Sequence, residues 1–300
     1  MGRSGQQAFL RTEEAGDGAG GGSRRRYDAI VVGARCAGAA TALLLARRFD
    51  SYIEGFALRF RVNEFIAVDM AGAIPLESLR EESLDEARRA RALFEAFMRE
   101  NGVPRADLAV ASLSYGWLDN APEGEAFVGS HGRVFDVIVM SRSEANSIGL
   151  RDKAIESGLF DSGRPILIAA PKPPPQIGAN VLVAWNCSTE QARTTAFAMP
   201  LLRKAERVTV LHVEGGAAVP GPSAAQATQY LQRNGIKAVL MTVGLEGRTT
   251  GEAILAAAQS LSCDLLIKGA YTQSRLRQMI FGGATRHILA HAALPVLMAN

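Results

Sequence analysis

The sequence is poor in cysteine and in aromatic residues, and it has no long apolar run. Its three cysteines, Cys36, Cys187 and Cys263, are odd in number and widely spaced, which argues against a disulfide framework and indicates a reducing compartment. No apolar stretch approaches the ~20 residues of a membrane-spanning helix, and no apolar core of a secretory signal stands near the amino terminus. We therefore expect a cytoplasmic protein that has no membrane partner.

Neither basic nor acidic residues are in large excess. The 33 basic and 30 acidic residues leave a formal net charge of +3, and part of this excess lies in the run from Arg24 to Arg26. A nucleic-acid-binding surface is therefore not expected. Apolar residues make up 48% of the 300 residues, which is enough for a sizeable core in about two domains.

Two breaks divide the chain. Residues 1–26 are rich in glycine and arginine and lack periodicity, which predicts a disordered tail. Residues 172–176, KPPPQ, contain three consecutive prolines and predict an extended linker. We therefore expect one domain over 27–171 and a second over 177–300.

The two domains contain similar segments. FDVIVMS at 135–141 resembles CDLLIKG at 263–269, and SGRPILIAAP at 162–171 resembles AALPVLMAN at 292–300. Nearly the same offset relates both pairs of segments, which predicts a tandem repeat of one α/β unit.

The second domain alternates strand patterns with helix patterns. A capping box at Ser188 and Gln191 starts its first helix, and Gly235 ends its second helix. Such alternation predicts a parallel sheet with helices on both faces, and ligands bound beyond the carboxyl ends of the strands. We expect strands near 180–185, 207–213, 237–243, 264–269 and 295–299, and helices near 188–204, 222–234, 250–261 and 283–292.

The first domain follows the same plan but carries an insertion. The apolar stretch at 60–79 predicts a loop packed over the sheet, and a lid or a partner surface is the alternative. We expect strands near 28–33, 51–58, 107–114, 135–140 and 165–169, and helices near 38–48, 80–101 and 150–158.

A glycine-containing loop in the second domain suits a phosphate group. A strand ends at Gly269, and a loop then leads to the start of a helix near 283. Glycines allow a close approach to the backbone, and the helix amino terminus adds positive potential. Arg275, Arg277 and Arg286 add further charge nearby.

This region resembles the universal stress protein family. DLLIKGAYTQSRLRQMIFGGATRHILAHAALPVLMAN looks like the family's carboxyl-terminal end, and NVLVAWNCSTEQARTTAFAMPLLRKAERVTVLHVE looks like its first strand, helix and second strand. FDVIVMS and SGLFDSGRPILIAAP are similar to strands of the degenerate first repeat in tandem bacterial members. The resemblance implies two flavodoxin-like (adenine nucleotide hydrolase-like) three-layer α/β units, each with a parallel five-stranded sheet, and a stress-response regulatory or binding role.

The resemblance also implies an ATP or AMP site in the second unit. Asn186 stands where nucleotide-binding members have an aspartate that meets the ribose or adenine, and His212 stands where the second strand lines the adenine pocket. Gly269 matches the first glycine of the family's phosphate motif, and Gly282 matches the third.

Two positions depart from that motif. Thr272 replaces the second glycine, and Gly283 replaces the serine or threonine whose hydroxyl would meet phosphate. Thr285 offers a hydroxyl two residues later. A Cβ at position 272 crowds any geometry that needs positive φ, so a ligand-free interaction scaffold remains an alternative to nucleotide binding.

A second resemblance concerns residues 27–48, which contain GARCAG. This stretch looks like the FAD-binding amino terminus of flavin monooxygenases, with Gly33 in the tight turn and Gly38 at the close helix–strand contact. Glu54, at the end of the second strand, would bind the ribose. The chain has no late Gly-Asp segment of the kind that such enzymes use, so FAD is not expected and a flavin oxidoreductase remains an alternative.

Catalytic and metal-binding patterns are scarce. No Ser/His/Asp order or carboxylate pair stands out, so we expect no enzyme, with weak ATPase activity or flavin chemistry as alternatives. His287 and His291 are spaced like metal ligands on one helix, but no third ligand accompanies them, and no metal is expected. His131 is predicted at the surface. Family members pair through their last strands, which implies that 295–298 lines a contact between units or between two chains.

Overall fold

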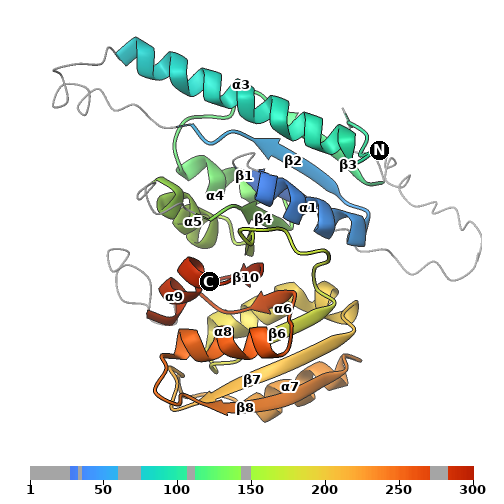
Figure 1. The fold of residues 1–300 in the computed structure, drawn as a ribbon, viewed down its shortest axis with the longest axis vertical. Helices are drawn as coiled ribbons and strands as arrows, with labels where there is room; N and C mark the ends of the chain where they lie inside the picture. The colour runs from blue at the N-terminus through green and yellow to red at the C-terminus, as the bar shows by residue number, and fades with distance from the viewer. Residues whose placement is uncertain (1–27, 33–35, 60–75, 107–111, 143–149, 271–282) are drawn as a thin grey trace, which may run out of the picture.

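The computed structural model describes residues 28–32, 36–59, 76–106, 112–142, 150–270 and 283–300. Gly33, Thr272 and Gly282 lie outside the described residues, as do the predicted tail at 1–26 and most of the predicted insertion at 60–79. Within the described residues the chain is an α/β protein whose strands form one sheet with helices on both sides (Figure 1). The predicted fold class is confirmed.

The strands divide into two units of the same order. Parallel strands run in the order β3-β2-β1-β4-β5 in the first unit and β8-β7-β6-β9-β10 in the second. The strands are β1 (Ala29–Val32), β2 (Tyr52–Phe56), β3 (Ser114–Leu118), β4 (Val137–Met140), β5 (Ile166–Ile168), β6 (Asn180–Ala184), β7 (Arg207–Glu214), β8 (Ala238–Gly244), β9 (Leu265–Ile267) and β10 (Val296–Met298).

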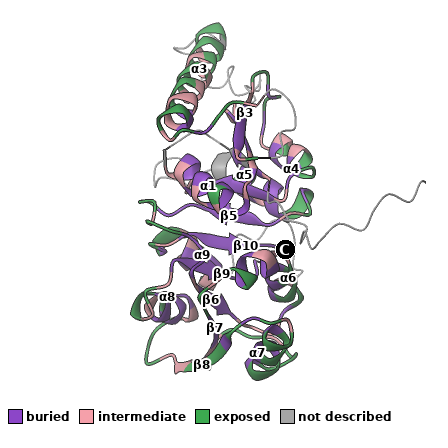
Figure 2. Cartoon of the chain, turned by 90° about the vertical axis from the view of Figure 1, so that its right-hand side faces the viewer, coloured by how far each residue is buried: buried purple, intermediate pink, exposed green. Residues whose placement is uncertain are grey.

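Helices cover both faces of the sheet. Phe94 of α3 and Leu201 of α6 belong to the buried cluster on one face, and Val128 of α4 and Ile254 of α8 belong to the cluster on the other. Figure 2 shows buried residues along the strands and exposed residues on the outer sides of the helices. The central strands are therefore apolar on both sides, as in other covered parallel sheets. The helices are α1 (Cys36–Phe49), α3 (Leu76–Glu100), α4 (Ala126–Gly132), α5 (Leu150–Asp161), α6 (Thr189–Arg203), α7 (Ala224–Arg233), α8 (Thr250–Ser260) and α9 (Gly283–His291).

The two units share one continuous sheet. β10 pairs antiparallel with β5, so that Leu297 lies opposite Leu167 and both are fully buried. The sequence predicted that 295–298 lines a contact between units or chains, and the structure forms this contact within the chain. Each unit keeps its five strands, and the two sets join into one sheet because the edges of β5 and β10 satisfy each other's backbone groups.

Side chains also tie the units together. The Arg48 guanidinium donates to the Gly178 carbonyl at 3.1 Å and to the Lys204 carbonyl, and the Lys204 ammonium lies 4.3 Å from the centre of the Phe49 ring. Burial lowers the pKa of Arg142 to about 10, and its guanidinium donates to a carbonyl of the second unit just before β10. The units are therefore held together by both backbone and side-chain contacts.

Prediction from the sequence was less accurate in the first unit. The third strand was expected at 107–114 but runs from Ser114 to Leu118, where Tyr115 and Trp117 pack their rings against Phe94. Helix α4 was missed, because it has only 7 residues and its N-cap, Glu125, makes no side-chain cap bond. Tertiary packing decides both elements, and no local signal marks either.

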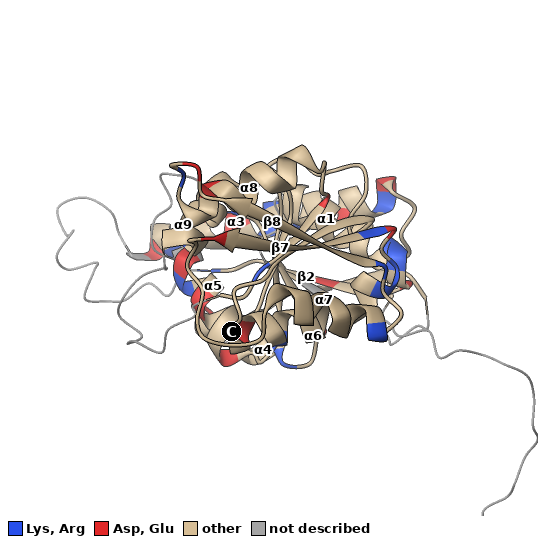
Figure 3. Ribbon diagram, turned by 90° about the horizontal axis from the view of Figure 1, so that it is seen from below, with Lys and Arg blue, Asp and Glu red and all other residues tan. Residues whose placement is uncertain are grey.

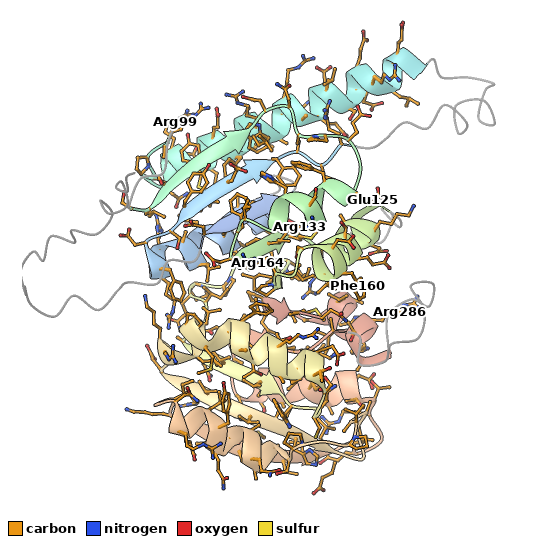
Figure 4. All side chains as sticks on the ribbon, turned by 180° about the vertical axis from the view of Figure 1, so that it is seen from behind. Arg99, Glu125, Arg133, Phe160, Arg164 and Arg286 are labelled. Carbon is orange, nitrogen blue, oxygen red and sulfur yellow. The ribbon has the colours of Figure 1, made fainter. Side chains whose placement is uncertain are left out.

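Helix α3 is much longer than its counterpart α7. α3 has 25 residues and α7 has 10, yet their carboxyl ends match. Gly102 follows α3 and Gly235 follows α7, with φ values of +69° and +78°. The N–H of the residue after each glycine donates to a carbonyl in the last turn of the helix, that of Met98 in α3 and that of Leu231 in α7. The extra turns of α3 are therefore at its amino end, which runs past the sheet (Figures 1 and 4).

Candidate functional site

The strand order of the second unit reverses at β6. β6 lies between β7 and β9, and the helices that follow β6 and β9 pack on opposite faces of the sheet. In parallel α/β sheets the carboxyl ends of two such strands form the usual ligand site. The residues at this edge are therefore the first candidates for function.

Gly269 brings the end of β9 against the first turn of α6. Its N–H donates to the Gln191 side-chain oxygen at 2.7 Å, and Gln191 is completely buried. A Cβ on Gly269 would lie 2.5 Å from the Gln191 backbone nitrogen. Ser188 caps this helix by accepting from the Gln191 N–H at 3.1 Å, as predicted. The reciprocal half of the predicted capping box does not form, because the Ser188 N–H donates to Asn186 and the Gln191 oxygen accepts from Gly269. Only glycine fits at position 269 with this spacing between strand and helix.

Lys268 connects the same strand end to the first turn of α9. Its ammonium donates to the Gly269 carbonyl at 2.8 Å and to the Thr285 hydroxyl at 2.9 Å, and its side chain is buried. Burial lowers the pKa of Lys268 to about 8. Lys268 was not predicted as a site residue, although a lysine directly after the apolar residues LLI is a signal in the sequence.

At the start of α9 the Thr285 hydroxyl, which was considered as a phosphate contact, bonds to the protein itself. Thr285 is 4% exposed, and its hydroxyl is already engaged because it accepts the hydrogen bond from Lys268. Among the described residues, no heavy atom lies within 4 Å of a Cβ built on Gly283. These residues therefore leave room for a side chain of serine size.

Two loops close over the end of β6. The Asn186 side chain accepts from the Ser188 N–H at 3.3 Å within its own turn, and its carbonyl accepts from the Val219 N–H at 3.2 Å. Cys187 has a φ of +67°, and its carbonyl leaves no room for a Cβ on Gly221. These contacts hold the loop after β7 against the turn that contains Asn186.

His212 lies in β7, opposite Thr242 of β8, and is partly exposed. The structure thus gathers Asn186, Gly269, Gly283 and Thr285 around the strand ends or helix starts of the second unit, while His212 stands one strand further out.

The first unit makes the matching close contact in another way. A Cβ on Gly38, in α1, would lie 3.0 Å from the Ser141 hydroxyl at the end of β4. Gly38 therefore provides a close helix–strand contact, the kind of role predicted for it. Gly33, the predicted turn residue, lies outside the described residues.

Glu54 does not lie at a strand end. It is in the middle of β2, where its carboxylate lies 2.6 Å from His131 Nε2 and accepts from the Tyr52 hydroxyl at 3.1 Å. Burial and the neighbouring Glu54 charge raise the pKa of Tyr52. The predicted position of Glu54 at the end of the strand is therefore wrong. His131, expected at the surface, is partly buried against the Phe127 ring.

A cavity of about 160 Å³ lies between β8 and α8, beside the outermost strand of the second unit. Met241, Val243, Ala253 and Ala257 are among its lining residues. Among the described residues no group of three or more His, Cys, Asp or Glu side chains is placed to hold a metal ion. No described helix combines the length and apolar character needed to cross a membrane.

Figure 3 shows acidic and basic residues interspersed around the molecule, in keeping with the small net charge.

Comparison with known proteins finds a family match in the second unit. Residues 179–300 match the universal stress protein family. A universal stress protein of known structure from Archaeoglobus fulgidus DSM 4304 is similar with a TM-score of 0.64 at 15% identity, over 92% of this chain and 97% of that chain.

A functionally unknown protein from Pseudomonas aeruginosa PAO1 is similar with a TM-score of 0.53 at 14% identity, over 91% and 92% of the two chains. No curated protein matches this chain. At these identities the two structures show a shared fold that extends over both units.

Proposed function

Because residues 179–300 match the universal stress protein family, we propose that this chain is a stress-response binding protein whose second unit binds ATP or AMP. The nucleotide phosphates lie at the carboxyl ends of β6 and β9. The first unit has no glycine loop after Met140 and binds no nucleotide.

The observation that carries this proposal is the meeting of two helix amino termini at the end of β9. Gly269 is bonded to Gln191 in the first turn of α6, and Lys268 is bonded to Thr285 in the first turn of α9. The amino ends of helices carry unpaired N–H groups and a partial positive charge. Two of them beside one strand end favour a phosphate group at that place.

The two departures from the family motif lower the expected affinity. Gly283 lacks the hydroxyl that would bind phosphate, and Thr272 brings a Cβ where the motif has glycine. A hydrogen bond to a charged group contributes about 1.5–3 kcal/mol. Restoring one such bond therefore has a measurable effect, and Gly283→Ser fits because the Cβ position is open.

The test is calorimetric titration of ATP and AMP into the whole protein and into Gly283→Ser. We expect weak binding by the wild type and about tenfold tighter binding by the variant, the lower end of what one charged hydrogen bond supplies. Gly244→Ser is the matched control, because Gly244 also has open space at its Cβ position but lies at the end of β8.

Absence of binding to wild type and to Gly283→Ser at millimolar nucleotide would refute nucleotide binding and favour the ligand-free scaffold. An equal increase in nucleotide affinity in Gly283→Ser and in Gly244→Ser would show that the site lies elsewhere.

The proposed role is regulatory rather than catalytic. Among the described residues the strand-end site contains no paired carboxylates and no nucleophile beside a base. We expect no steady release of phosphate from ATP. The purified protein should also lack the visible absorbance of a flavin, a property that the cofactor itself would supply.

A further inference from the structure

Lys268 is an unusual residue for the interior of this sheet. In the second unit Ile267 of β9 pairs with Val183 of β6, and in the first unit Val139 of β4 pairs with Val31 of β1. The residues that follow, Lys268 and Met140, therefore occupy equivalent positions. Both are buried, at 7% and 2% exposure. The first unit therefore shows that an apolar side chain fills this position, and the lysine is not required by the fold.

The Lys268 ammonium has hydrogen-bond partners but no counter-ion among the described residues. Its partners, the Gly269 carbonyl and the Thr285 hydroxyl, are both neutral. Burial is the only resolved cause of its lowered pKa, which is about 8, and no carboxylate contributes. Burying an ammonium without an opposite charge is costly.

The surrounding elements do not supply the missing negative charge. The Glu190 carboxylate in α6 accepts from the Thr189 hydroxyl, and the Glu252 carboxylate in α8 accepts from the N–H and hydroxyl of its cap residue. On α9 the groups are Arg286, His287 and His291, none of them negative. The amino end of α9 adds positive potential at the same place. The charge of the Lys268 ammonium is therefore poorly balanced in the absence of a bound anion.

We propose that Lys268 is the positively charged residue of the strand-end site and that it takes up a proton from solvent when a phosphate-bearing ligand binds. This inference rests on the proposed function and names how that same site responds to pH. The phosphate supplies the counter-charge that the protein lacks, and the protonated amine in turn strengthens binding. Above the pKa of the free site each bound phosphate must bring a proton with it, so affinity falls as pH rises.

The test is calorimetric titration of ATP into the whole protein at pH 8 in two buffers of different ionisation enthalpy, Tris and HEPES. At this pH the free site is half protonated, and we expect uptake of about half a proton per nucleotide. Affinity should fall up to about tenfold between pH 8 and pH 9. Lys268→Met, which introduces the residue of the first unit, should lose proton uptake and bind at least about tenfold more weakly.

Two further variants separate charge from proton uptake. Lys268→Arg keeps a fixed charge, because arginine does not deprotonate in this range, and should bind without proton uptake. Lys237→Met removes an exposed lysine of the same unit and should leave both affinity and uptake unchanged.

Equal affinity and equal proton uptake in wild type and Lys268→Met would overturn this inference and leave the proposed function intact. Absence of binding to all of the proteins, Gly283→Ser included, would instead overturn the proposed function and this inference with it.

Discussion

The two units place the glycine of their closest strand–helix contact on opposite partners. In the second unit Gly269 is at the strand end and meets Gln191 of α6; in the first, Gly38 is in the helix and meets Ser141 at the strand end. The fold requires one residue without a side chain at this contact, and either element can supply it. Gly38 therefore has a packing reason to be glycine that does not depend on a bound dinucleotide.

The same edge differs in its polar groups. The second unit has Lys268 where the first has Met140, and it has Gly269 where the first has Ser141. Close packing at this strand end is common to both units, whereas the buried positive charge belongs to the second unit alone.

The largest expected effect comes from adding a methyl group at the glycine of each contact. Gly269→Ala places a Cβ 2.5 Å from a backbone nitrogen, which cannot turn aside, and should cost about 3 kcal/mol of unfolding free energy. Gly38→Ala meets the Ser141 hydroxyl at 3.0 Å, which can rotate, and should cost less than about 1 kcal/mol. Denaturant unfolding monitored by circular dichroism measures both. Equal losses would show that the two contacts are equally rigid.

The next effect is on the pH dependence of stability, and it is expected when Lys268 is replaced by methionine, the residue at the equivalent position of the first unit. The pKa of Lys268 is lowered from 10.5 to about 8 on folding, so between these values the unfolded state binds more protons and stability rises with pH. The full cost of burying the protonated amine is present below pH 8, and its relief across pH 8 to 10.5 amounts to about 3 kcal/mol.

Lys268→Met lacks this dependence. Its stability relative to wild type should therefore be highest near pH 7 and should decline as pH rises through that window. Thermal unfolding over the pH range gives the difference, and Met140→Lys should create the opposite, destabilising trend in the first unit. A difference between wild type and Lys268→Met that stays constant with pH would mean that the amine is not buried as described.

The smallest effect is expected at the polar cluster of Tyr52, Glu54 and His131 in the first unit. Glu54 corresponds by strand register to Thr209 of β7, so the second unit has no equivalent of its contact with His131. Glu54→Gln weakens the contacts with His131 and Tyr52 and should cost about 1 kcal/mol. His131→Gln should cost a similar amount, and the double variant should cost less than the two single losses combined if the groups act together. Additive losses would show that they do not.

The sequence predicted the second unit better because its signals are local. Ser188 with Gln191 and Thr249 with Glu252 mark helix starts within four residues of chain. Gly235 marks a helix end in the same way. Such signals need no knowledge of tertiary contacts, and the strands between them are continuous apolar runs.

The remaining features depend on contacts between distant segments. His131 meets Glu54 across 77 residues, and Lys268 meets Thr285 across 17. No pattern within one segment shows that these side chains will be neighbours, so His131 was expected at the surface and Lys268 was missed. The position of β3 depended likewise on the fit of Tyr115 and Trp117 against Phe94.

The antiparallel pairing of β5 with β10 has a consequence for biosynthesis. β5 ends at Ile168, and its partner β10 begins at Val296, so the ribosome completes the first unit long before the second can offer an edge to it. During that interval the outer edge of β5 has unpaired backbone groups and apolar side chains, the features that promote association between nascent chains. The speed at which the second unit folds therefore sets how long the first unit is exposed to aggregation.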